Sequence, residues 1–248
     1  MAARALRTMF LAESRLFLRD PFSLFFTLFF PVLLLLLFGA VYGSYDIGSG
    51  YRYVDAYVPA LFATVIGNLA LMEVPITLAS YRDVGILRRY QATPIPTWWV
   101  LLVQVLVKVC MFFVSALLII VCATLVFGLR FGGNPLLVLL AVLLSLAAMF
   151  ALGMVLAGMV PDVRAAQMIG SALFFVMLFT SGAALPREEF PPWLRSVTEF
   201  VPLTQAVELL TGLWLGAPLS DHRVALVSLT ALFVVAALIA GRVFRWRV

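Results

Sequence analysis

Six long apolar segments restrict what this chain can fold into more than any other feature. They cover residues 22–42, 55–80, 98–127, 135–160, 167–182 and 223–241. A helix needs about 20 mainly apolar residues to cross the hydrocarbon core of a bilayer. Lipid offers no hydrogen-bond partner to the backbone, so runs of this kind cross a membrane as α-helices. The sequence therefore predicts an all-α membrane protein, with residues 1–248 forming a single six-span transmembrane domain.

The composition supports this class and argues against a nucleic-acid-binding protein. Hydrophobic residues make up 64% of the chain and charged residues 12%, whereas soluble domains are about one quarter charged. The net charge of +5 comes mainly from arginines at span ends and in the terminal segments. Membrane orientation and anionic lipid headgroups account for arginines in these places. Membrane lipid is therefore an expected partner, and nucleic acid is not.

The distribution of arginine predicts the orientation of the spans. Six spans place both termini on the same side, and that side holds eleven arginines against five on the other. Short segments rich in Lys and Arg stay in the cytoplasm. We therefore expect both termini to be cytoplasmic in a multi-pass protein.

Residues 2–20 are too charged to cross a membrane and have two distinct faces. Arginines occupy one arc of a helical wheel and apolar residues the other: Arg4, Arg7, Arg15 and Arg19 against Leu6, Met9, Phe10 and Phe17. This pattern predicts an amphipathic helix on the inner membrane surface. A simple positively charged leader that sets topology is the alternative. Glu13 falls in the apolar arc, where it either extends to the interface or meets a partner cation.

The first span carries phenylalanines at three- and four-residue steps, which places them on one broad stripe. They are Phe22, Phe25, Phe26, Phe29 and Phe30. The stripe either faces lipid tails or forms an apolar wall along the path of an amphipathic substrate. Pro31 removes a backbone hydrogen bond, and we expect it to bend this helix.

Glu73 and Lys108 are charged residues inside the second and third spans. Each lies nine residues from the inner boundary of its span, or roughly 13 Å along a helix. Unpaired charges at that depth are costly. We hypothesise that the two side chains form an intramembrane ion pair. The competing interpretation is that each faces a wet cavity or another subunit.

Residues 184–218 differ from the other connecting segments. Prolines at positions 186, 191, 192, 202 and 218 divide them into short pieces, two of which are amphipathic. Neither piece is long enough to cross about 30 Å of hydrocarbon. We interpret them as two short re-entrant helices that dip into the outer leaflet and return. An ordinary external loop lying on the membrane is the alternative.

Few residues in the chain are suited to catalysis. There is no GxxxxGK[ST] phosphate loop, no HExxH motif and no Cys/His ligand cluster. Thr180-Ser181-Gly182 resembles part of a GxSG turn but lacks its first glycine, and the only histidine, His222, is far away along the chain. We therefore expect a non-catalytic protein with no metal or cofactor of its own.

Residues 81–96, YRDVGILRRYQATPIP, form a polar and basic interruption between the second and third spans. Val84, Leu87 and Gln91 share one helical face, and three arginines surround it: Arg82, Arg88 and Arg89. An apolar ridge rimmed with charge suits docking into a groove on a soluble partner. Gly85 permits a sharp turn or a close approach. A plain positively charged cytoplasmic loop is the alternative interpretation.

Two groups of motifs in this chain resemble a known family. The first is Arg82-Asp83-Val84-Gly85-Ile86-Leu87-Arg88-Arg89 followed by Ala92-Thr93-Pro94. The second is Ser181-Gly182-Ala183-Ala184-Leu185-Pro186, then Phe190-Pro191-Pro192-Trp193-Leu194 and Val201-Pro202-Leu203. The chain is similar over nearly its whole length to the membrane subunit of type-2 ABC exporters, a permease family that includes bacterial drug, polysaccharide and lipid-like exporters.

This resemblance implies a permease that works with separate subunits. Two permease copies, or one copy and a homologous permease, would sit on ATP-binding-cassette ATPase subunits that hold ATP and Mg. The segment after the second span would be the coupling helix, with these residues at the ATPase contact: Arg82, Asp83, Val84, Gly85, Leu87, Arg88, Arg89 and Gln91. The protein would export a drug-like, lipid or glycan-lipid compound across a bacterial inner membrane, as in drug efflux and antibiotic resistance.

The expected substrate path lies between two copies, with the first, second and fifth spans as its walls. Candidate residues are Phe25, Phe29, Asn68, Phe174 and Phe179. An ATP-independent transporter or a membrane scaffold remains the alternative function. Such a transporter would need a coupling-ion site, for which Asp55, Glu73 and Lys108 are the candidates. An intramembrane enzyme that uses Ser181 is a third possibility.

Overall fold

The computed structural model describes residues 2–48, 50–85, 98–184 and 190–243. Its elements, in chain order, are α1 (Ala2–Arg19), α2 (Pro21–Leu24), the π-helical turn η1 (Phe25–Phe29), α3 (Phe30–Tyr42), β1 (Asp46–Gly48), β2 (Tyr51–Arg52), α4 (Tyr53–Asn68), the π-helical turn η2 (Leu69–Glu73), α5 (Val74–Asp83), α7 (Trp98–Phe127), α8 (Pro135–Met159), α9 (Val163–Thr180), α10 (Pro192–Thr198), α11 (Pro202–Trp214), the 3₁₀ turn η4 (Leu219–His222) and α12 (Arg223–Val243). Six helical segments in this part of the chain are long and apolar enough to cross a membrane. The prediction of an all-α, six-span protein is confirmed.

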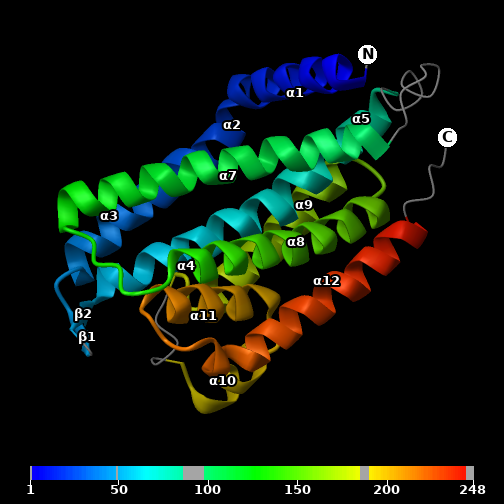
Figure 1. Ribbon diagram of the computed structural model, residues 1–248. Helices are drawn as coiled ribbons and strands as arrows, with labels where there is room; N and C mark the ends of the chain where they lie inside the picture. The colour runs from blue at the N-terminus through cyan, green and yellow to red at the C-terminus, as the bar shows by residue number, and fades with distance from the viewer. Residues whose placement is uncertain (1, 49, 86–97, 185–189, 244–248) are drawn as a thin grey trace.

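The second span, made of α4, η2 and α5, is the centre of the bundle. In its most apolar 18-residue stretch, 89% is buried inside the protein, compared with 22% for the first span and 17% for the last. Figure 1 shows it surrounded by the other spans, and it contacts α3, α7, α8, α9 and α11. A helix that is apolar all round is buried in this way. Side chains on the second span can therefore contact several other spans at once.

The first two spans each contain a π-helical turn, η1 or η2, and each turn is followed two residues later by proline. In η1, Phe30 donates its N–H to Phe25 O, five residues back. Pro31 has no N–H and so cannot bond to Thr27 O. In η2, Val74 donates to Leu69 O in the same way, and Pro75 follows. The prolines therefore widen the helices locally and leave carbonyl groups without their usual donors.

The freed carbonyl groups meet two different partners. The hydroxyl of Ser115 on α7 donates to Thr27 O at 2.6 Å. In η2, the carbonyl oxygens of Ala70 and Leu71 lie so close to Gly153 of α8 and Gly170 of α9 that a Cβ on either glycine would collide with them. Small residues allow helices to approach this closely in a membrane. The second π turn therefore packs directly against the backbones of two other spans.

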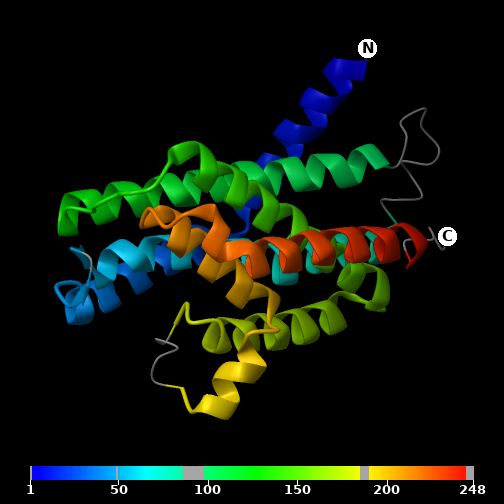
Figure 2. The same cartoon turned by 60° about the horizontal axis from the view of Figure 1, so that its bottom comes forward.

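Helix α1 packs against α7 by its apolar side. Phe17 is buried, while Arg7, Arg15 and Arg19 are exposed. Figures 1 and 2 together show α1 at an angle to α7 and reaching the bundle at its C-terminal end. The predicted amphipathic helix is present, and the buried side chain of Phe17 packs its C-terminal end against the bundle.

The segment before α12 forms the pair α10 and α11. Leu203, at the start of α11, lies beside Gly67 of α4, whereas Trp214, at its end, contacts Phe131 in the connection between α7 and α8. Helix α11 therefore runs back along α4 toward the N-terminal end of α4, and its first residues lie deep in the bundle. Figure 2 shows α10 to one side, inclined to α11. Two short helices form this segment, as predicted; α11 packs inside the bundle, whereas α10 has only Thr198 buried and lies at the edge of the bundle.

Candidate functional site

Glu73 and Lys108 lie together inside the bundle. Lys108 Nζ donates to Glu73 Oε2 at 3.0 Å, and the two residues are only 4% and 6% exposed. Lys108 Nζ also lies 4.6 Å from the centre of the Phe17 ring, an arrangement that attracts a cation electrostatically. Glu73 is the last residue of η2, and Lys108 lies two to three turns into α7. The pair therefore joins the second and third spans, and Phe17 brings α1 to the same place.

Ser23 extends this pair to the first span. Its hydroxyl lies 2.8 Å from both carboxylate oxygens of Glu73 and 2.6 Å from Asp20 Oδ2. Asp20 in turn accepts N–H groups from Phe22 and Ser23 and so caps the short helix α2. Buried charges need partners that use their remaining hydrogen-bonding capacity. Glu73 has such partners from two neighbouring spans.

Two more hydrogen-bonded groups lie one or two turns away from this pair on the same spans. Toward the N-terminal end of the second span, Asn68 Nδ2 donates to Thr27 Oγ1 at 3.4 Å. Toward the C-terminal end of that span, the Tyr81 hydroxyl donates to Glu13 Oε1, and Gln104 Nε2 donates to the Tyr81 hydroxyl oxygen at 2.7 Å. Glu13 therefore meets a tyrosine hydroxyl, which was neither of the two expected alternatives.

These three groups form a polar seam through the apolar bundle. We define the polar seam as Glu13, Ser23, Thr27, Asn68, Glu73, Tyr81, Gln104, Lys108 and Ser115. Its members come from α1, the first three spans and their π turns. Sequence reasoning missed Ser23, Thr27, Tyr81, Gln104 and Ser115. The spacing of polar residues within apolar spans could have revealed them, because Ser23–Thr27 and Gln104–Lys108 are four apart and lie on one helix face.

Asp55, the third candidate for a coupling-ion site, is also occupied by contacts within the chain. It is fully buried in the first turn of α4. Its carboxylate accepts the N–H of Arg52 at 2.9 Å and that of Arg130 at 2.8 Å, and Arg52 Nε lies 3.5 Å away. Asp55 therefore ties the N-terminal end of α4 to the connection after α7.

The expected docking segment is described as far as Gly85. Arg82 and Asp83 belong to the last turn of α5, and Val84 is 65% exposed. Gly85 has a φ of +69°, so it ends the helix in the left-handed conformation that glycine tolerates. None of the described residues would touch a Cβ at Gly85, so within this part of the chain the glycine is explained by the sharp turn. The remaining expected contacts, Leu87, Arg88, Arg89 and Gln91, lie outside the described residues.

The candidates for a substrate path fall into two groups. Phe25, Phe29 and Phe179 are exposed on the outside of the chain. Phe174 is 1% exposed and packs beside Gly67 within the bundle, and Asn68 belongs to the polar seam. Packing within the chain covers both Phe174 and Asn68, and their place on a substrate path stays a prediction.

Ser181 and His222, the two residues considered for catalysis, make local backbone and packing contacts. The Ser181 hydroxyl donates to Leu178 O at 3.1 Å and accepts the N–H of Ala183. His222 lies against Gly212 near the start of α12. Within the described ranges, no three His, Cys, Asp or Glu side chains gather where they could hold a metal ion. Among the described residues, the Ser181 hydroxyl has only these two backbone partners.

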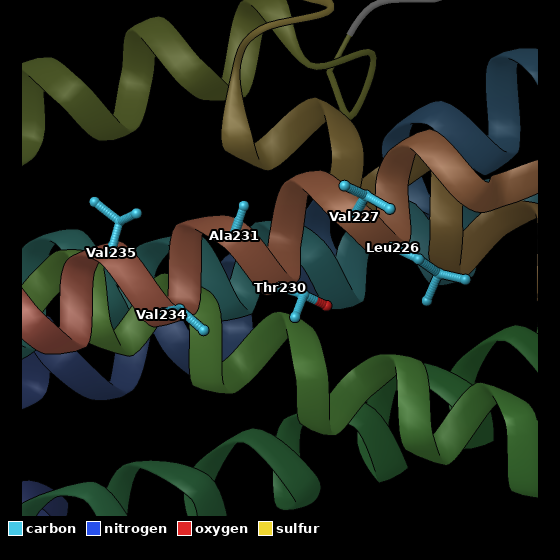
Figure 3. A pocket seen from close by; sticks show the side chains of 6 residues that line it. All are labelled: Leu226, Val227, Thr230, Ala231, Val234 and Val235. Carbon is cyan, nitrogen blue, oxygen red and sulfur yellow. The ribbon is translucent and has the colours of Figure 1, made fainter.

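Helix α12 carries a shallow apolar groove, shown in Figure 3. Its lining is Leu226, Val227, Thr230, Ala231, Val234 and Val235. The groove has no titratable side chain, and valines on it are well exposed. Such a surface on the last span is suited to contact with lipid tails.

The fold and the polar seam define a polytopic helical membrane protein with a buried Glu73–Lys108 ion pair inside the bundle. Its family follows from comparison with known proteins: residues 4–215 match the ABC-2 type transporter family. The match covers most of the chain, and the protein belongs to this family. It is a membrane-spanning permease component of a transporter. None of the curated proteins compared with the chain is similar to it.

Proposed function

We propose that this chain is the permease subunit of an ATP-driven exporter in a bacterial inner membrane, with both termini in the cytoplasm. A separate ATP-binding-cassette ATPase would dock on the segment that begins at the end of α5 and continues through residues 86–97. Two permease copies, or this chain and a homologue, would enclose the path. The cargo would be an amphipathic or hydrophobic compound, as in drug efflux.

One observation favours an ATP-driven permease over a transporter that uses an ion gradient. An ion-driven transporter needs a coupling-ion site in the membrane, and an ionisable side chain free to bind the ion is one way to form it. Glu73, Lys108 and Asp55 were the candidates, and each is buried in contacts within the chain. Replacing those contacts with a bound ion would first require breaking them.

The exposed end of α5 supports docking of a soluble partner. Val84 is largely exposed directly before the Gly85 turn, and the following residues carry Leu87 with Arg88 and Arg89. An exposed apolar side chain beside cationic residues suits a protein interface. The exposed phenylalanines of the first span, Phe25 and Phe29, support a path for an apolar compound.

The proposal is tested by isolating the protein from native membranes and measuring transport in inside-out vesicles. We expect an ATP-binding-cassette ATPase to co-purify, and uptake of a lipophilic dye to require ATP. Uptake should survive an ionophore that collapses ion gradients. The proposal is overturned by a preparation without any such ATPase whose transport proceeds without ATP and stops with the ionophore.

A further inference from the structure

Arg82 and Asp83 both reach across to the turn that joins α8 to α9. Arg82 Nη2 donates to Val160 O at 2.9 Å. Asp83 Oδ2 accepts the N–H of Val163 at 3.3 Å. Val160 ends α8, and Val163 is the first residue of α9. Two adjacent side chains at the end of the second span thus hold both sides of one cytoplasmic turn.

The charges of the two side chains match the helix ends that they contact. The C-terminal end of a helix carries unpaired carbonyls and partial negative charge, and the N-terminal end carries unpaired N–H groups and partial positive charge. The cationic Arg82 meets a carbonyl at the end of α8, and the anionic Asp83 meets an N–H at the start of α9. Asp162 is the N-cap of α9 and accepts the N–H of Ala165. The Asp83 contact is therefore not needed as a cap, and its effect is to connect α9 to α5.

An apolar cluster supports the same junction from inside the bundle. Ala79 of α5, Val160 and Ala166 of α9 are buried against one another. The side chain that follows the two contacts, Val84, is by contrast exposed. At the end of α5, Arg82 and Asp83 thus face α8 and α9, whereas Val84 faces away from the bundle.

We propose that Arg82 and Asp83 are positioning residues that fasten the start of the docking segment to α8 and α9, and are not themselves contacts of the ATPase. A force on the segment after Gly85 then moves the fourth and fifth spans together with the second. This inference rests on the proposed function, because it assigns the transmission step to particular residues. It replaces the expectation that Arg82 and Asp83 touch the ATPase directly.

The first arm of the test measures the junction itself and needs no ATPase. Spin labels at Val84→Cys and Met159→Cys occupy exposed sites on either side of it, after Cys110 and Cys122 have been replaced by serine. Labelled protein diluted with unlabelled protein reports the distance within one chain. We expect a narrow distance distribution that broadens in Arg82→Met and in Asp83→Ala. Arg82→Lys, which can still donate to Val160 O, should remain narrower than Arg82→Met.

The second arm uses the complex and separates positioning from contact. We expect Arg82→Met to leave the Kd for the ATPase unchanged while transport per ATP hydrolysed falls about tenfold, the factor that loss of a charged hydrogen bond can carry. Val84→Asp, at an exposed site, should instead weaken ATPase binding. The inference is overturned if Arg82→Met weakens binding tenfold while the Val84–Met159 distance distribution stays narrow. A wild-type protein that binds no ATPase would refute the proposed function, and the distance measurement would still test the junction.

Discussion

Lys108 Nζ lies 3.0 Å from Glu73 Oε2, deep inside the bundle and between the third and second spans. The Ser23 hydroxyl holds the same carboxylate from the first span. One ion pair therefore connects three of the six spans. Its position makes it a structural centre of the bundle formed by the first three spans.

Removing one member of the pair should destabilise the protein strongly. Lys108→Met leaves the Glu73 carboxylate buried without its cation, at a cost of about 3–5 kcal/mol. Thermal denaturation in detergent measures the loss. The exchanged pair, Glu73→Lys with Lys108→Glu, should recover only part of the stability, because a carboxylate at position 108 would face the Phe17 ring. A double variant no more stable than the worse single variant would contradict the pairing.

Ser115 should matter because Pro31 cannot supply an N–H to Thr27 O. Ser115→Ala leaves that buried carbonyl without a donor, which costs about 1–3 kcal/mol. Thr124→Ala is a matched control, since Thr124 bonds only to a carbonyl of its own helix and is exposed. Pro31→Ala in the Ser115→Ala background restores an N–H and should recover stability in the same melting assay. Equal effects of the Ser115 and Thr124 changes would argue against this role.

The glycines that face η2 should not tolerate a side chain. Gly153→Ala and Gly170→Ala place a methyl group against the Ala70 and Leu71 carbonyls, and overpacking of this kind costs about 1–3 kcal/mol or more. Gly241→Ala, where no described residue lies within 4 Å of the Cβ position, is the control. Size-exclusion chromatography of the fluorescently tagged protein reports the folded fraction. Full folding of both variants would show that the spans can separate without cost.

Hydropathy was sufficient to predict the spans, and the equal depth of Glu73 and Lys108 in adjacent spans was sufficient to hypothesise their pairing. Both arguments depend on position along a helix, which the sequence contains. The π turns were not predicted. Pro31 indicated a bend, but the group that donates to the freed Thr27 O is the Ser115 hydroxyl, 88 residues away along the chain.

The contact between Arg82 and the turn after α8 could not be predicted from the sequence. The partner of Arg82 is the backbone carbonyl of Val160, and a backbone partner leaves no mark in residue types. Phe174 illustrates the opposite problem. Its place in an aromatic run fits a lipid-facing or path-facing residue equally well, and only the packing of Gly67 and Leu203 beside it shows that it is buried.

The central claim is that an ATPase drives this permease through the segment after α5, and Leu87→Asp tests it most directly. Leu87 belongs to the proposed docking ridge, and Leu87→Met is the matched control that keeps it apolar. ATP-dependent dye uptake should be measured in vesicles with equal amounts of inserted, folded protein. We predict that Leu87→Asp loses uptake and ATPase binding while Leu87→Met retains both. Normal ATPase binding and normal uptake by Leu87→Asp would contradict the account.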